Sequence, residues 1–154
     1  MFKLLDKWDF IRSTRIMITI SLLILSACGD KQIKTPSSEI YKFEQFKRKE
    51  KFNEDQSILY PGISAQSLKP LLTENINHIA DDFYTLAVKN YATEKNYQDK
   101  IEIGLKRFSL IYENLDTEDR ERICAYIQEL MDIVGLENSG GHLNNFIYGF
   151  EPTK

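Results

Sequence analysis

The sequence predicts an all-α protein that folds as a small bundle of four to five helices. Three segments carry apolar residues at three- and four-residue steps, which places one apolar stripe along each predicted helix. No run of strict apolar–polar alternation is long enough to form a sheet. Hydrophobic residues make up 42% of the 154 residues, which is typical of a globular protein rather than a disordered chain. The net charge of −3 provides no positive surface for nucleic acid, so we expect no nucleic-acid partner.

The N-terminal residues 1–27 are predicted to be a signal peptide. Their first part contains four cations: Lys3, Lys7, Arg12 and Arg15. The uncharged run 16–25 follows, and as a helix it would span about 15 Å, half of a hydrocarbon core. A basic flank before a short apolar run is typical of a secretory signal. Translation from Met1 fits this pattern better than translation from Met17, which would leave no positive charge before the run.

The uncharged run leads into Leu25-Ser26-Ala27-Cys28, which resembles the bacterial lipobox of an aliphatic residue, two small residues and a cysteine. In lipoproteins of that type the cysteine becomes the mature N-terminus and carries lipid. The resemblance therefore implies cleavage before Cys28 and an acyl anchor, such as palmitate, on that residue. We expect a lipid-anchored protein of the cell envelope, at the periplasmic face or the cell surface. The alternative is an ordinary signal peptide in which Cys28 is incidental.

The segment after the signal peptide is predicted to be a polar tether over residues 28–38, followed by a helical domain over residues 39–154. The apolar spacing in 39–54 suits one short helix. That stretch also contains a basic cluster, which we interpret as a solvated face or a contact for anionic headgroups: Lys47, Arg48, Lys49 and Lys51. Pro61-Gly62 is typical of a type II turn, in which glycine supplies a positive φ.

Two long helices are predicted next, over residues 65–90 and 96–113. Each carries one apolar stripe, and Asn96 is suited to cap the second helix. Gly104 lies in the middle of that helix, where it costs about 1 kcal/mol relative to alanine. The position therefore predicts a close approach by a neighbouring helix.

The third long helix is the best defined, over residues 117–134. Asp116 is a suitable N-cap, and Gly135 can end the helix in the left-handed conformation. Residues 139–141 are Ser-Gly-Gly and indicate a loop, with an anion-binding nest as the alternative. A short aromatic helix or turn is predicted over residues 142–150.

One histidine and three carboxylates on one face of the first long helix could bind a metal: Glu74, His78, Asp81 and Asp82. Nothing obvious completes a coordination sphere, so we expect neither a metal nor a cofactor. Cys124 is interpreted as a buried core thiol, and the alternative is a nucleophile that would need His78 or His142 as its base.

The third helix also carries five carboxylates that could act as a glycosidase pair: Asp116, Glu118, Asp119, Glu121 and Asp132. Arg120 and Arg122 lie between them, which is more typical of an exposed, salt-bridged face. We therefore place Glu118, Asp119 and Glu121 on the solvated side of the helix.

Three stretches carry a resemblance over residues 40–154: LYPGI at 59–63, the whole of 116–141, and LNNFIYGF at 143–150. Together they resemble a small helical bacterial family known only as a domain of unknown function. That resemblance implies an all-helical domain and transfers no catalytic residue. The acidic segment beginning at Asp116 and the LNNFIYGF end are also similar to amidase-immunity proteins of type VI secretion, small helical envelope proteins that block a toxin's active site.

The sequence therefore favours a non-catalytic, protein-binding module held at the membrane by lipid, in its specific form an immunity-type inhibitor whose acidic surface docks a basic partner. We expect the partner contact at six residues: Glu118, Glu121, Ser139, Gly140, Gly141 and Tyr148. An envelope enzyme acting on cell wall or lipid is one alternative. A structural lipoprotein without a ligand is the other. The partner, the choice of membrane and the oligomeric state stay open.

Overall fold

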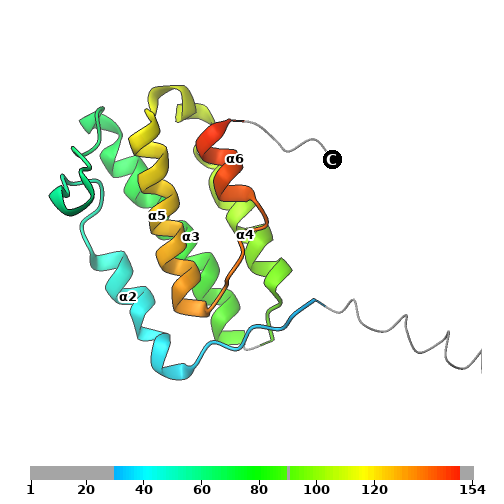
Figure 1. Cartoon of the computed structure of the whole chain (residues 1–154). Coiled ribbons are helices and arrows are strands. Elements are labelled where there is room, and N and C mark those ends of the chain that lie inside the picture. Colours follow the sequence, from blue (N-terminus) through cyan, green and yellow to red (C-terminus); the bar gives the residue numbers. More distant parts are fainter. Residues whose placement is uncertain (1–29, 90, 150–154) are drawn as a thin grey trace, which may run out of the picture. The chain divides into compact units, whose positions relative to one another are not determined.

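The computed structural model describes residues 30–89 and 91–149, and these form an all-α bundle as predicted (Figure 1). The predicted signal peptide and Cys28 lie outside the described residues. The α-helices are α2 (Tyr41–Arg48), α3 (Lys69–Lys89), α4 (Glu94–Lys106), α5 (Thr117–Val134) and α6 (His142–Tyr148). The 3₁₀ helices are η1 (Ser37–Glu39), η2 (Gln56–Ile58), η3 (Gln66–Leu68) and η4 (Ser109–Asn114). In this described part the only β pairing is two isolated bridges, and no helix is long and apolar enough to cross a membrane.

Helix α3 is the centre of the bundle, since it packs against α2, α4 and α5 (Figure 1). Helix α6, the last helix of the chain, packs against both α4 and α5. Fully buried side chains from four helices fill the space between them, among them Phe43, Ile76, Phe83, Tyr97 and Ile123. Burial of this apolar surface, rather than helix propensity, provides most of the stability of such a bundle.

The helix ends follow local signals in two of the three long helices. Asp116 caps α5 by accepting a hydrogen bond from the backbone N–H of Asp119 at 2.8 Å, and Gly135 ends that helix with a φ of 73°. Helix α4 begins earlier than predicted, because Thr93 rather than Asn96 is its N-cap. Asn96 instead accepts from the backbone N–H of Thr93, which completes a capping box.

Gly104 lies where α3 and α4 approach closely, as its place in the helix predicts. A Cβ atom at this position would lie 2.6 Å from Cγ1 and 2.7 Å from Cδ1 of Ile79. Ile79 is fully buried, so the missing side chain is what allows the two helices to touch.

The predicted tether is wrong for Lys31 to Thr35, which pack onto the domain. The backbone N–H of Ile33 donates to the carbonyl of Ala92 at 2.8 Å, and the N–H of Glu94 donates to the carbonyl of Lys31 at 2.8 Å. The Ile33 side chain belongs to the hydrophobic core. A polar composition concealed this pairing, because backbone hydrogen bonds do not depend on side-chain polarity.

The basic cluster predicted around residue 50 is not a free cationic surface. Lys51 is buried, and its Nζ donates to the carbonyls of Phe46 at 2.7 Å and Lys49 at 3.1 Å, closing the end of α2. Burial lowers the pKa of Lys51 to about 8. Two other members make ion pairs to neighbouring helices, Lys47 with Asp81 and Lys49 with Glu129. The cluster thus attaches α2 to α3 and α5.

Candidate functional site

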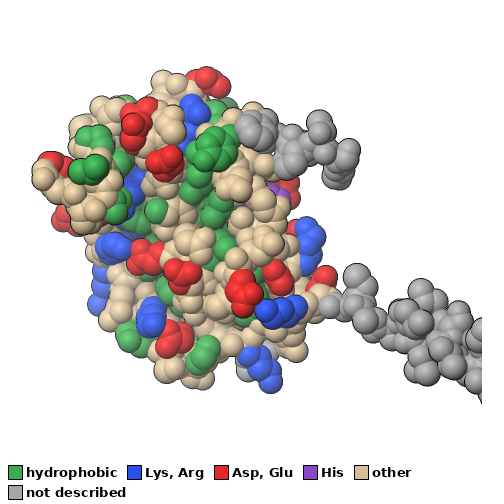
Figure 2. All heavy atoms as spheres, viewed as in Figure 1, with side chains coloured by type: hydrophobic (Ala, Val, Ile, Leu, Met, Phe, Trp, Pro, Cys, Tyr) green, Lys and Arg blue, Asp and Glu red, His purple; other side chains and the backbone are tan. Residues whose placement is uncertain are grey.

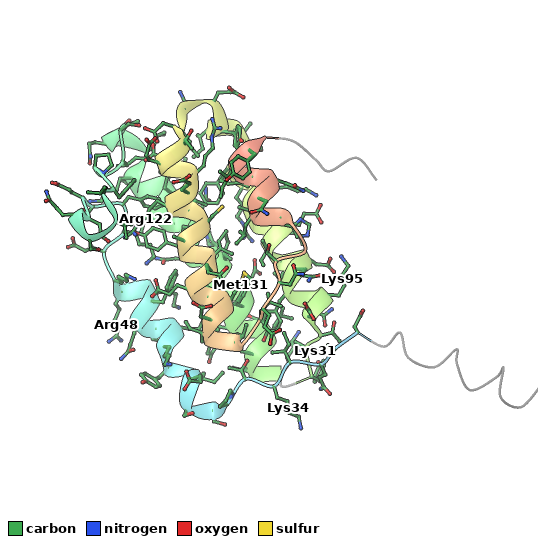
Figure 3. All side chains as sticks on the ribbon, in the orientation of Figure 1. Lys31, Lys34, Arg48, Lys95, Arg122 and Met131 are labelled. Carbon is green, nitrogen blue, oxygen red and sulfur yellow. The ribbon has the colours of Figure 1, made fainter. Side chains whose placement is uncertain are left out.

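The first two turns of α5 gather contacts from two other parts of the chain. Both the loop before α3 and the helix η4 contact α5 there, and η4 in turn contacts the end of α6, at the end of the bundle remote from Lys31 (Figures 1 and 3). We call the exposed side chains at this end the distal surface: Ile58, Leu59, Leu110, Glu118, Glu121 and Tyr148. Figure 2 shows acidic side chains beside hydrophobic ones on this end.

Asp119 lies beneath the distal surface, so its predicted place on the solvated side of the helix is wrong. It is fully buried, and its carboxylate accepts from the hydroxyls of Tyr60 and Ser64, each at 3.0 Å. Burial raises the pKa of Asp119, while the two hydroxyl contacts oppose that shift. Because the carboxylate is inaccessible, its role is to hold the loop before α3 against α5.

The two arginines of α5 stack on aromatic rings, and the ion pair of Arg122 is with Asp55 of another segment rather than with a carboxylate of α5. The guanidinium carbon of Arg122 lies 4.8 Å from the ring centroid of Tyr126 and 5.4 Å from that of Tyr60. Arg122 also pairs with Asp55 at 3.3 Å. Arg120 lies 4.2 Å from the ring centroid of Tyr112. These cation–π contacts add rigidity to the base of the distal surface.

Leu59 projects from this rigid base at the tip of a tight turn. The backbones of Asp55 and Tyr60 pair in both directions, at 2.8 and 3.0 Å, and Leu59 lies between them. Its side chain is 88% exposed and its φ is 56°, in the left-handed region that bulky residues rarely adopt. Asp55 also caps η2 by accepting from the backbone N–H of Ser57. A strained, exposed leucine held by this many contacts is a feature typical of functional sites.

The other apolar members of the distal surface are supported by aromatic packing. The Tyr112 hydroxyl donates to the carbonyl of Phe146 at 2.7 Å, and the two rings meet edge to face. This contact joins η4 to α6, which carry Leu110 (95% exposed) and Tyr148 (62% exposed). Both side chains therefore present apolar surface from ordered elements.

The predicted partner residues separate into two groups in the structure. Glu118 and Glu121 are exposed on the first turns of α5, and Tyr148 is exposed at the end of α6. The loop 139–141 lies instead beside α4, since a Cβ atom on Gly140 would lie 3.2 Å from Cδ of Gln98, and Gln98 donates to the carbonyl of the preceding Asn138 at 3.1 Å. Leu59 and Leu110 were missed by the sequence reasoning, since exposure of an apolar side chain leaves no signal in local periodicity.

Two carboxylates of the candidate metal-binding face, Asp81 and Asp82, are engaged with cations from outside α3. His78 faces Glu74 at 3.6 Å. Asp82, however, accepts from Arg107 at 2.8 Å and from Lys100 at 3.0 Å. Burial tends to raise the pKa of Asp82, but these two hydrogen bonds hold it below its usual value. Nowhere in residues 30–89 and 91–149 do three potential ligands of the His, Cys, Asp or Glu type gather.

Cys124 is a core residue, as predicted. Its side chain is 5% exposed and its Sγ contacts the carbonyl of Leu143 at 3.6 Å. Burial raises the pKa of the Cys124 thiol to about 12, which suppresses the nucleophilic thiolate.

Two shallow grooves lie away from the distal surface, along the C-terminal half of α5. One, of about 340 Å³, lies between α2 and α5 and is crossed by the ion pair between Lys49 and Glu129. The other, of about 410 Å³, continues toward the N-terminal segment. Both mix acidic and basic side chains, including Asp132 on their shared wall.

Comparison with known proteins adds a family and a structural neighbour. Residues 34–151 match the model of DUF4844, described as a domain of unknown function. A solved DUF3571 family protein from Acinetobacter baumannii AYE is 32% identical, with a TM-score of 0.66, and the match covers 73% of this chain and 90% of that one. The search among curated proteins found no match.

Proposed function

The chain belongs to the DUF4844 family, a domain of unknown function, and we propose that this member is a lipid-anchored, protein-binding module of the bacterial cell envelope. The proposal has two parts: an anchor at Cys28 and a binding site at the distal surface. Each part has its own support and its own experiment.

The anchor is supported by the order of features in the first 28 residues. A basic flank, an uncharged run and the lipobox-like Leu25-Ser26-Ala27-Cys28 follow one another as lipid attachment requires. Multiple acyl chains on Cys28 would hold the domain stably at a bilayer, whereas a single chain binds only marginally.

A clickable fatty acid fed to cells tests this anchor. Wild type and Cys124→Ser should incorporate the label equally, and Cys28→Ser should lose it and accumulate as an unprocessed precursor. Cys124→Ser is the matched control, because it removes the other cysteine of the chain. Equal labelling of Cys28→Ser would refute the anchor.

The binding site is supported chiefly by Leu59. Exposing a leucine in a left-handed conformation costs free energy of about 1–3 kcal/mol and gives the isolated domain no packing in return. Apolar side chains that are exposed together mark sites of protein contact. Leu59, Leu110 and Tyr148 all have this character.

The acidic members of the distal surface suggest the chemistry of the partner. Glu118 and Glu121 point from the first turns of α5 and can attract a basic surface, which accelerates association and makes it salt-dependent. An immunity-type inhibitor that blocks a basic toxin face is the specific version of this proposal. The loop 139–141 is left out of the contact because it lies beside α4.

Photo-crosslinking from the envelope tests the binding site. A photoreactive amino acid replaces Leu59 in one variant and Ile103, an exposed residue of α4, in the control. A partner should be crosslinked from residue 59 and not from residue 103. The double variant Glu118→Lys, Glu121→Lys should reduce the yield at low salt.

A matched charge control completes this experiment. Glu74→Lys with Asp132→Lys makes the same change of charge at exposed sites on α3 and on the last turn of α5. This control should crosslink like wild type. Equal crosslinking from residues 59 and 103, or equal losses in both double variants, would refute the placement of the partner on the distal surface.

A further inference from the structure

The N-terminal segment leaves the bundle at one defined place. Ile33 pairs with Ala92 and Lys31 with Glu94, so the segment is fixed beside the loop between α3 and α4. Thr35 is also buried, at 7% exposure. The first residue held by these backbone contacts is Lys31, at the end of the bundle opposite Arg122 (Figure 3).

The distance from this exit point to Cys28 is bounded by covalent geometry. Two residues, Gly29 and Asp30, separate Cys28 from Lys31, and the three Cα–Cα steps between them span about 10 Å when fully extended. That length is close to the Debye length of about 8–10 Å at physiological ionic strength. If Cys28 carries the anchor, charged side chains near Lys31 lie within electrostatic range of lipid headgroups.

The side chains around the exit point suit such a surface. Lys34 and Lys89 are exposed, and neither makes an ion pair within the described ranges. Tyr91 and Val88 are 66% and 49% exposed beside them. Exposed lysines attract anionic headgroups, and tyrosine favours the membrane–water interface. We call Lys31, Lys34, Val88, Lys89 and Tyr91 the proximal surface.

Acidic side chains are also present at this end: Asp30 is exposed, and Glu137 and Asp99 engage neighbouring lysines. Lys31 lies 3.9 Å from Glu137, and Lys95 lies 2.5 Å from Asp99. Figure 3 shows Lys31, Lys34 and Lys95 at the same end of the bundle. The positive charge available to an external surface is therefore carried by Lys34 and Lys89.

We infer that the proximal surface rests on the anionic headgroups of a bilayer, so that the distal surface is directed away from the membrane. This inference rests on the proposed anchor at Cys28, since the short connection is what brings the proximal surface to the headgroups. An unanchored domain with these few lysines would bind a bilayer weakly. The arrangement would leave Leu59 and Glu118 accessible to a partner.

The test uses the processed full chain, purified in detergent and reconstituted into vesicles. A fluorophore is placed at the proximal surface through Tyr91→Cys, or at the distal end through Leu110→Cys. The vesicles contain equal parts of phosphatidylglycerol and phosphatidylcholine, with a headgroup nitroxide lipid as quencher. Mass spectrometry of the same preparation reports whether Cys28 carries acyl chains.

The label at residue 91 should be quenched several-fold more than the label at residue 110. Lys34→Glu with Lys89→Glu should abolish that difference, and the matched reversal Arg48→Glu with Lys106→Glu should not. Vesicles of phosphatidylcholine alone should quench the label at residue 91 less strongly than the vesicles that contain phosphatidylglycerol. Circular dichroism of each variant verifies that the bundle is intact.

Each other outcome overturns the inference in a distinguishable way. An acylated chain with equal or reversed quenching at residues 91 and 110 would refute the proximal contact and leave the anchor intact. If quenching at residue 91 changes neither in the double variant Lys34→Glu, Lys89→Glu nor with the charge of the lipid, headgroup recognition is refuted. A chain without acyl groups on Cys28 would refute the anchor, and this inference with it.

Discussion

Substituting Gly104 by alanine should destabilise the bundle, although alanine is the better helix former. Helix propensity alone predicts a gain of about 1 kcal/mol for this change. The new Cβ, however, would lie 2.6 and 2.7 Å from two carbon atoms of Ile79, a fully buried residue. Overpacking of this kind costs about 1–3 kcal/mol. The net loss in the free energy of unfolding should therefore be about 0–2 kcal/mol.

The sign of this effect should reverse when Ile79 is shortened. Ile79→Ala removes both atoms that the new Cβ would meet, at a cost of about 2–5 kcal/mol by itself. In that background Gly104→Ala should stabilise the protein by about 1 kcal/mol, because the propensity gain remains and the clash is gone. The coupling between the two positions should thus be about 1–3 kcal/mol.

Urea denaturation of the four proteins in this cycle, followed by far-UV circular dichroism, measures the coupling. Ile79→Val serves as a milder second background if Ile79→Ala proves too unstable to give a folded baseline. It removes Cδ1 but keeps Cγ1, so in this background Gly104→Ala should be less destabilising without a reversal of sign. If Gly104→Ala stabilises the wild-type chain by about 1 kcal/mol, or has the same effect in both backgrounds, the close approach of α3 and α4 at this position is wrong.

Three further predictions concern buried polar and titratable groups. Cys124→Ala should cost about 1–2 kcal/mol through lost burial, and thiol reagents should modify native Cys124 slowly because burial raises its pKa to about 12; rapid modification of the folded protein would contradict burial. Burial lowers the pKa of Lys51 to about 8, so as the pH rises the folded state loses this proton before the unfolded state does. The free energy of unfolding of wild type, relative to that of Lys51→Met, should therefore rise by up to about 3 kcal/mol between pH 8 and 10.5. A difference in urea midpoints between the two proteins that does not change with pH would count against the buried ammonium. Asp119 has a raised pKa, so the native state binds the carboxyl proton more tightly than the unfolded state does. The free energy of unfolding should therefore fall as the pH rises from the usual pKa of an aspartate to the raised pKa of Asp119. Asp119→Asn should remove that slope in an acid titration, and Asp119→Ala should cost about 2–4 kcal/mol by leaving the hydroxyls of Tyr60 and Ser64 without their acceptor; an unchanged slope in Asp119→Asn would assign it to another group.

Part of the candidate site was also predictable from sequence. Glu118 and Glu121 are exposed as expected, because they lie off the apolar stripe of a helix whose phase is visible in the sequence. Asp119 was misplaced, since a carboxylate at the start of a helix is usually solvated and nothing near it in sequence reveals Tyr60 and Ser64 as its partners. Leu59 was missed for the complementary reason, because its exposure depends on a turn closed by Asp55 and Tyr60.

The sequence by itself determined the helical class, the order of the elements and the ends of α5, because these depend on periodicity and on caps within a few residues. Asp116 and Gly135 act locally, and even the close approach at Gly104 is signalled by one residue. Tertiary structure alone decided the burial of Lys51 and Asp119, the docking of Ile33 and the stacking of Arg122. Asp119, Ile33 and Arg122 contact groups that are far apart from them in the chain. Lys51 finds its acceptors in nearby carbonyls, but it is buried only because α2 packs against α3 and α5. In each case a buried polar group needs partners that satisfy it, and packing between elements decides which groups are buried.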